Sequence, residues 1–256
     1  MYKRQLLIGN RVEKNLSSGI YLDGAIGVYV RNNYLGGNSK EGICLDNGTT
    51  SSVVTANDIV GNGKRWGKED YVLERDFVLR WGRMEDGTST AKVPGMSVDN
   101  AVYNLIMGNN ISGNFGSGIK IVRTGFYNVI GRNIISNNNV GANKTHFFFG
   151  IELGGAVSDT PPDPAAELDF LPSRGNVIFQ NVITGPHYAG IQFCPDCDDN
   201  DVFDNVILRP RVWAVEQTRP GTENHFTNNF SPAKSRNAAL NGLLGRVLIG
   251  GEGMQD

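Results

Sequence analysis

The sequence is poor in cysteine, in net charge and in long apolar runs. Its only Cys-x-x-Cys pair, Cys194 and Cys197, has no further ligands at a spacing usable for zinc, so we expect two turn cysteines, which a secreted protein could join as a local disulfide. The formal net charge of −2 gives no basic surface for nucleic acid or an anionic membrane. No run approaches about 18 apolar residues, so no membrane span is predicted. Amphipathic helical periodicity is also scarce, which favours β-structure.

Turn-forming residues are abundant instead. The chain has 33 glycines and many asparagines, both of which tolerate left-handed backbone. An Asn-x4-Asn-apolar pattern recurs, with steps of 22, 25, 52, 24, 48, 24 and 24 residues between successive copies. The copies are counted at Asn10, Asn32, Asn57, Asn109, Asn133, Asn181, Asn205 and Asn229; the earlier asparagine is present only from the copy at Asn109 onward, and the apolar residue follows within two positions.

A companion pattern, Gly-apolar-x-apolar, follows most copies of the asparagine pattern. It begins at Gly19, Gly42, Gly95, Gly118, Gly150 and Gly190, with a weaker copy at Trp213. Short period-2 strands in units of about 24 residues are typical of a β-solenoid, in which each unit is one coil. One asparagine per coil suits a ladder of side-chain amides that hydrogen-bond from coil to coil.

These paired strands, as in Gly118–Ile121 and Asn133–Asn138, resemble the right-handed parallel β-helix superfamily of carbohydrate-processing proteins. That group includes pectate lyases, polygalacturonases, alginate epimerases, inulin fructotransferases and phage tailspikes. The resemblance covers residues 5 to 230 and implies an all-β, right-handed parallel β-helix of about eight or nine coils. No family's catalytic set transfers, because the Asp-Pro-His-Asp of the epimerases and the Trp-x-Asp-His of the lyases are missing.

The repeat also predicts the organisation of the chain. We expect the β-helix over residues 1–232, with inserts at about 61–92, 138–147 and 155–174, and a C-terminal cap or tail over 233–256. No signal peptide is visible, and no N-terminal cap is recognisable, so we expect the N-terminus to be truncated. The resemblance implies a secreted, cell-surface or periplasmic protein, with a homotrimer as one possible assembly.

The inserts all adjoin the Gly-apolar-x-apolar strands, so we expect them to wall a groove over the middle coils. Trp66 and Trp81 suit stacking on a sugar ring, although they could equally seat their insert on the solenoid. Lys144 and His146 come from the second insert and are predicted, with Arg123, to contact the substrate.

Alternation predicts which residues of these strands point outward. The first outward position carries Tyr21, Cys44, Ser97, Lys120, Glu152, Gln192 and Glu216, and the second carries Asp23, Asp46, Asp99, Val122, Gly154 and Cys194. Three successive coils thus present an aspartate at the same position. Carboxylates that lie this near to one another suit acid–base catalysis or cation binding. The alternative is that each aspartate only begins a turn, as in Asp46-Asn47-Gly48.

The leading hypothesis is a glycoside hydrolase or glycosyl transferase acting on a poly- or oligosaccharide. Asp99 with Asp46 or Glu152 would supply the acid, base or nucleophile, and the sequence does not choose between retention and inversion. Lys120 is grouped with these catalytic residues and would bind substrate together with Arg123, as would Tyr21 and Asp23.

Two alternatives stay open. A lyase or epimerase would use Lys120 or Arg123 as the base, with Ca²⁺ against a uronate; otherwise no metal or cofactor is expected. Lys120 could instead form only a salt bridge with Asp99 or Glu152. The other alternative is a non-catalytic, tailspike-like or adhesin β-helix that binds glycans.

Overall fold

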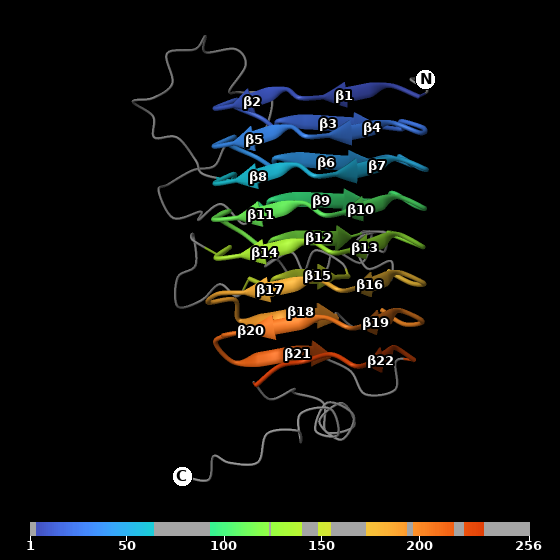
Figure 1. The fold of residues 1–256 in the computed structure, drawn as a ribbon. Coiled ribbons are helices and arrows are strands. Elements are labelled where there is room, and N and C mark those ends of the chain that lie inside the picture. The colour runs from blue at the N-terminus through green and yellow to red at the C-terminus, as the bar shows by residue number, and fades with distance from the viewer. Residues whose placement is uncertain are drawn as a thin grey trace, which may run out of the picture.

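The chain winds around a single axis, and each coil contributes up to three short strands (Figure 1). A computed structural model describes residues 4–63, 93–122, 124–139, 148–154, 173–193, 197–217 and 223–232. Over these ranges the regular structure is entirely β. The ranges therefore contain no helix that could cross a membrane.

The strands form three parallel sheets that run the length of the molecule. The first sheet has eight strands: β1 (Leu6–Ile8), β4 (Tyr29–Arg31), β7 (Val53–Thr55), β10 (Leu105–Met107), β13 (Val129–Gly131), β16 (Val177–Phe179), β19 (Asp201–Phe203) and β22 (His225–Thr227). The second has seven: β2 (Arg11–Glu13), β5 (Tyr34–Gly36), β8 (Asp58–Val60), β11 (Asn110–Ser112), β14 (Ile134–Ser136), β17 (Val182–Thr184) and β20 (Val206–Leu208).

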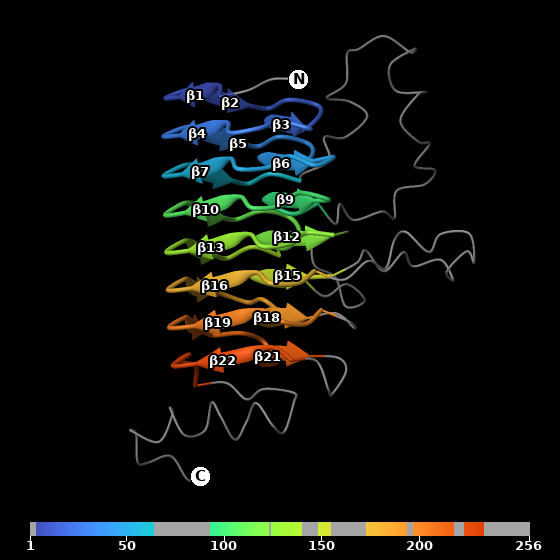
Figure 2. The same cartoon turned by 90° about the vertical axis from the view of Figure 1, so that its right-hand side faces the viewer.

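The third sheet also has seven strands, stacked one above another in Figure 2. They are β3 (Ile20–Asp23), β6 (Ile43–Asp46), β9 (Met96–Asp99), β12 (Ile119–Val122), β15 (Ile151–Leu153), β18 (Ala189–Phe193) and β21 (Trp213–Gln217). Each strand pairs in register with the strand one coil away, as Ile119 does with Met96 and Ile151. The stack of eight coils confirms the predicted number.

The core is a column of aliphatic side chains inside the three sheets. Each coil buries the same positions, so that Val54, Ile106 and Ile130 of successive first-sheet strands are all fully buried. Burying one such side chain stabilises the fold by about 1.5–3 kcal/mol. In the third sheet the apolar residues of the Gly-apolar-x-apolar motif point inward, as predicted, as with Ile119 and Ile121.

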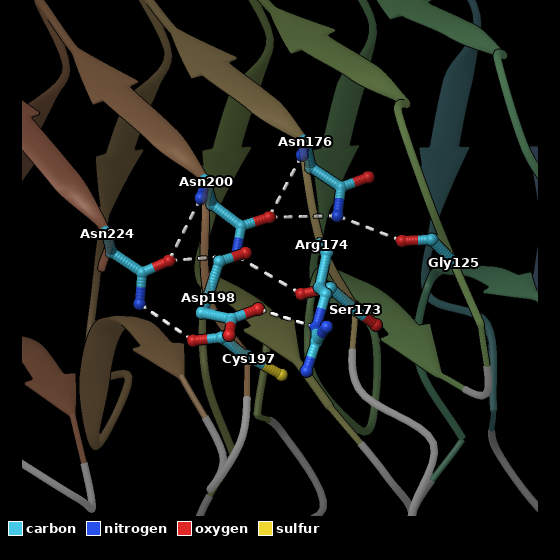
Figure 3. A network of polar contacts seen from close by, with 8 residues as sticks. All are labelled: Gly125, Ser173, Arg174, Asn176, Cys197, Asp198, Asn200 and Asn224. Carbon is cyan, nitrogen blue, oxygen red and sulfur yellow. Dashed lines mark hydrogen bonds and ion pairs between the residues drawn. The ribbon is translucent and has the colours of Figure 1, made fainter. Parts of the chain in front are cut away.

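Three asparagine ladders hold the corners between the sheets. In Figure 3, Asn176 Nδ2 donates to Asn200 Oδ1 at 3.0 Å, and Asn200 Nδ2 donates to Asn224 Oδ1 at 2.9 Å. Each amide also donates to a backbone carbonyl of the preceding coil, as Asn176 does to Gly125. The ladders thus satisfy buried polar groups at every turn.

The predicted ladder lies between the first and second sheets, with one correction. Asn33, not Asn32, is its member: Asn33 Nδ2 donates to Asn57 Oδ1 at 2.9 Å, and Asn32 is the preceding turn residue with a φ of 55°. The other two ladders lie five residues to either side along the chain. Their members are Asn15, Asn38, Asn62, Asn114 and Asn138 at one corner, and Asn104, Asn128, Asn176, Asn200 and Asn224 at the other.

A glycine precedes the first inward residue of six of the seven third-sheet strands, β21 having Ala214 there, and close packing requires it. A Cβ on Gly118 would lie 2.5 Å from Ile135 Cγ2, 2.7 Å from the Gly150 carbonyl oxygen and 3.0 Å from Asn138 Nδ2. Only a residue without a side chain lets the backbone pass this close to the ladder and the neighbouring coil. The motif that marks the repeat therefore has a steric cause.

Candidate functional site

The polar residues predicted at the site lie on the outer face of the third sheet, in two rows. The central row runs in strand register through Tyr21, Cys44, Ser97, Lys120, Glu152, Gln192 and Glu216. The end row, where the strands finish, contains Asp23, Asp46, Asp99 and Val122. The structure therefore stacks the residues as the alternation predicts; their roles stay predictions.

The end row brings carboxylates together on neighbouring coils. Asp23 pairs in register with Asp46, and Asp46 and Asp99 directly follow Leu45 and Val98, which also pair. Neighbouring strands lie about 4.8 Å apart. Three aspartates thus follow one line along the solenoid axis.

Asp46 is held by two donors. Its Oδ2 accepts a hydrogen bond from the Tyr21 hydroxyl of the preceding coil, and its Oδ1 accepts one from the Asn47 backbone N–H at 2.8 Å. The hydrogen bond to Asp46, with partial burial, raises the pKa of the Tyr21 phenol. The Asn47 contact begins a left-handed turn, with a φ of 48° at Asn47. Asp46 therefore fills the turn role as well as presenting a fixed carboxylate.

Lys120 and Glu152 form an ion pair in the central row. Lys120 Nζ lies 2.8 Å from Glu152 Oε1, and the two side chains are only 22% and 11% exposed. Glu152 Oε2 accepts a second hydrogen bond, from Ser117 Oγ, at 2.8 Å. The salt bridge weighed for Lys120 is thus present. Lys120 and Ser117 together engage both oxygens of the Glu152 carboxylate.

The central row is closely packed where it leads from Tyr21 to the Lys120–Glu152 ion pair. Cys44 and Ser97 are only 6% and 7% exposed, although both point outward. Burial, with the charges of Glu41, Asp46 and Asp99, raises the pKa of the Cys44 thiol. A thiol of this kind is a poor nucleophile at neutral pH, so the carboxylates are the better candidates for chemistry here.

Five of the predicted site residues lie outside the described residues. These are Trp66, Trp81, Arg123, Lys144 and His146. The segment with Trp66 and Trp81 precedes β9, and the segment with Lys144 and His146 precedes β15. Their predicted contacts with substrate stay predictions. Among the residues that are described, no three His, Cys, Asp or Glu side chains cluster as metal ligands.

Ser117 is a site residue that the sequence analysis missed. It contacts Glu152, and its Oγ also accepts a hydrogen bond from the Phe149 backbone N–H at 3.1 Å. Ser18 also donates to a glutamate of the next coil, Glu41, at 2.7 Å, but Glu41 precedes the strand motif whereas Glu152 lies within it. Both serines directly precede the glycine of the Gly-apolar-x-apolar motif. This shared position is the sequence feature from which Ser117 could have been identified.

Comparison with known proteins supports the architecture. A family described as a right handed beta helix region matches residues 1–72. The chain is a right-handed parallel β-helix. The A-module of a mannuronan C-5 epimerase from Azotobacter vinelandii superposes with a TM-score of 0.57 at 17% identity, covering 90% of this chain and 59% of the other.

Two further solved structures have the same fold. A periplasmic alginate epimerase gives a TM-score of 0.59 at 14% identity, covering 92% of this chain and 46% of the other. A pectate lyase gives 0.52 at 14% identity, covering 89% and 50%. The chain thus spans 46–59% of the length of these three proteins. No curated protein matches it in sequence.

Proposed function

We propose that the outer face of the third sheet binds a poly- or oligosaccharide, and that Asp46 and Asp99 cleave or transfer a glycosidic bond there. The observation that carries the proposal is the placement of these two carboxylates on neighbouring coils. Asp46 is fixed by Tyr21 and by the backbone of Asn47. A solenoid gains little stability from a line of aspartates, whereas glycosidic cleavage needs a carboxylate pair.

The geometry favours a division of roles. Asp46, held by two donors, attacks the anomeric carbon, while Asp99 protonates the departing glycosidic oxygen. Water, or a sugar hydroxyl in a transfer, then displaces Asp46 with Asp99 acting as the base. Neighbouring strands about 4.8 Å apart favour the retaining arrangement, in which the two carboxyl groups are about 5–5.5 Å apart. Glu152 is better suited to positioning Lys120, because both its oxygens are engaged.

The comparisons support a saccharide as the ligand. The names of the three solved structures specify mannuronan, alginate and pectate, all of them polysaccharides. Substrates of this class also support the inference that the protein acts in the periplasm, at the cell surface or outside the cell. A homotrimer stays a prediction.

Elimination or epimerisation is the second candidate. It is favoured by Lys120 at the middle of the central row and by the epimerases and the lyase among the similar structures. A lysine base must be neutral, and the 2.8 Å ion pair with Glu152 stabilises the charged ammonium instead. Ca²⁺ would enter only in this candidate, against the carboxylate of a uronate.

The test is mass spectrometry of a polysaccharide panel incubated with the protein, with ultraviolet absorbance followed for unsaturated uronates. We expect products that have gained water, or transferred sugar, and a loss of about 10²- to 10⁴-fold in rate for Asp99→Asn. Asp201→Asn, on the first sheet, is the matched control and should keep the wild-type rate.

Three results would count against the proposal. Full activity of Asp99→Asn would remove this residue from the mechanism. Unsaturated products that disappear in Lys120→Ala would establish elimination instead. Intact polymers throughout, with binding retained, would favour the glycan-binding adhesin.

A further inference from the structure

Two exposed tyrosines stack on each other. Each lies in the turn that leads from the third sheet to the first on its own coil. Tyr103 and Tyr127 are 60% and 49% exposed, and their rings lie 5.1 Å apart between centroids with planes only 10° apart. They occupy equivalent positions on neighbouring coils, because Tyr103 N–H donates to the carbonyl of Phe126. The two rings thus form one flat stack along the solenoid axis.

One end of this stack is closed. A Cβ on Gly175 would lie 2.5 Å from the ring of Tyr127, so the glycine backbone covers that face. Phe126 meets the same ring edge-on at 6.2 Å. Tyr103 therefore presents the other, outer face of the stack.

The row beyond Tyr103 carries small residues. The bridges from Thr50 to Val102 and to Ile26 place Ser51 and then Gly27 on the next two coils. Arg4 lies at the end of this row, next to Gly27: a Cβ on Gly27 would lie 3.7 Å from Arg4 Cγ. Neighbouring coils lie about 4.8 Å apart, so a six-membered sugar ring can lie against the face of Tyr103 above Ser51.

Core packing does not account for these two aromatic residues. Both have left-handed backbone, with φ of 57° at Tyr103 and 55° at Tyr127, a conformation that bulky side chains rarely adopt. Glycine, serine or aspartate fills the same position at Gly27, Ser51, Gly175 and Asp199. Within the described ranges, neither phenol hydroxyl forms a hydrogen bond with the protein.

We propose that Tyr103 is a stacking platform for a pyranose ring of a saccharide chain. The apolar C–H face of the sugar lies on the ring. The hydroxyls of Ser51 and Thr50, which lie 3.5 Å apart, and the guanidinium of Arg4 are the groups that hydrogen-bond to its hydroxyls. Binding at the platform does not require catalysis. The platform shares no side chain with the Asp46–Asp99 pair, although Asp99 lies only four residues before Tyr103.

Affinity electrophoresis of the full chain in gels containing alginate, polygalacturonate, xylan or mixed-linkage β-glucan tests the platform. The measurements use the Asp99→Asn background, so that no polymer is consumed. We expect at least one polymer to retard the protein. Tyr103→Ala should weaken that binding by about tenfold, while Tyr103→Phe stays within about threefold, because the ring rather than the hydroxyl makes the contact. Ile134→Ala, an equally exposed apolar residue on the second sheet, should bind as the parent does.

Thermal unfolding of each variant keeps the result interpretable. Tyr103→Ala should stay folded and unfold close to the parent's temperature, since the ring it removes is mostly exposed and loses only the stack on Tyr127. The platform is overturned if no polymer retards the parent, if Tyr103→Ala binds like the parent, or if Tyr103→Phe loses as much affinity as Tyr103→Ala. Failure of the carboxylate mechanism is a separate outcome, seen as turnover that survives Asp99→Asn while the Tyr103 effect on binding remains.

Discussion

At the scale of single residues, His187 shows how burial controls charge. It lies just before β18 and is only 1% exposed. Its Nε2 is buried and has no hydrogen-bond partner in the described part of the chain. Burial lowers the pKa of His187 to about 4, because the charged ring would lose its hydration without a compensating partner.

Because His187 is buried in its neutral form, we expect acid to lower the free energy of unfolding. The unfolded chain titrates the ring near a pKa of about 6.5, so between about pH 6.5 and 4 the unfolded state binds more protons than the folded state. The free energy of unfolding contributed by His187 is therefore full above about pH 6.5 and falls with decreasing pH, by roughly 2–3 kcal/mol at pH 4.5. Urea titrations at pH 7 and pH 4.5 should show this loss in the wild type and not in His187→Gln.

The exposed His225, which pairs with Asp201, supplies the control. His225→Gln should keep the wild-type difference in unfolding free energy between the two pH values. A His187→Gln variant with an undiminished difference would show that other groups cause the acid sensitivity.

The sequence predicts where a residue lies more readily than what it contacts. The two-residue period of a strand and the 24-residue period of the coil together determine that Asp46 and Asp99 share a row. The contact of Glu152 with Lys120 depends on how far each side chain extends across coils, and periodicity carries no such information. The choice of Asn33 over Asn32 could have been made from the period, since steps of 23 and 24 residues fit it better than steps of 22 and 25.

At the scale of elements, the asparagine ladders stabilise the fold beyond what the short strands alone provide. Asn133 is fully buried, and its Nδ2 donates to the carbonyl of Ile106 and to Asn181 Oδ1, both at 3.0 Å. Its Oδ1 accepts from the backbone and side chain of Asn109 at 2.9 and 3.0 Å. One side chain therefore satisfies buried groups on both neighbouring coils.

Removing such a side chain should be costly. Asn133→Ala leaves the Asn109 N–H and the Ile106 carbonyl buried without these partners, at about 1–3 kcal/mol for each group. We expect the free energy of unfolding to fall by about 3 kcal/mol or more, measured by urea denaturation at pH 7.

Asn110 provides a matched control on the adjacent strand. Among the described residues its Nδ2 donates only to Asp58 Oδ1, at an exposed site. Asn110→Ala should change the free energy of unfolding by about 0.5 kcal/mol or less. Equal effects of the two substitutions would contradict a special role for the ladder.

Much of this element structure could be predicted, because every corner imposes the same requirement. The asparagine and glycine patterns both arise from tight backbone passage, so both recur once per coil. The five-residue spacing that places Asn104, Asn109 and Asn114 at three successive corners was present in the sequence, but only one of the three ladders was recognised from it.

At the scale of the whole molecule, the described strands pair only with strands of the neighbouring coils, so stability should be nearly additive along the axis. Deleting Val182–Asn205, a complete coil of 24 residues, joins Asn181 to Val206, the residue that pairs with Val182. We expect a folded β-rich protein with an unchanged shape of far-ultraviolet circular dichroism and a lower urea midpoint.

The control deletes half a coil. Removing Val182–Phe193 takes out 12 residues, including β17 and β18, and leaves the second and third sheets without these strands while β19 and β20 remain. That variant should lose cooperative unfolding of the C-terminal coils. Loss of cooperative folding in the full-coil deletion as well would argue against the additive picture.

Gly63 and Val93 meet although 29 residues separate them: a Cβ on Gly63 would lie 2.6 Å from the Val93 carbonyl oxygen. The solenoid itself fixes this junction, since Gly63 N–H donates to the coil before it and the Val93 carbonyl accepts from Gly116 on the coil after it. The entropy cost of joining two fixed points through a chain segment depends only logarithmically on the length of that segment. The junction is therefore a grafting point, where segments of different length and specificity can be exchanged while the scaffold beneath keeps its register.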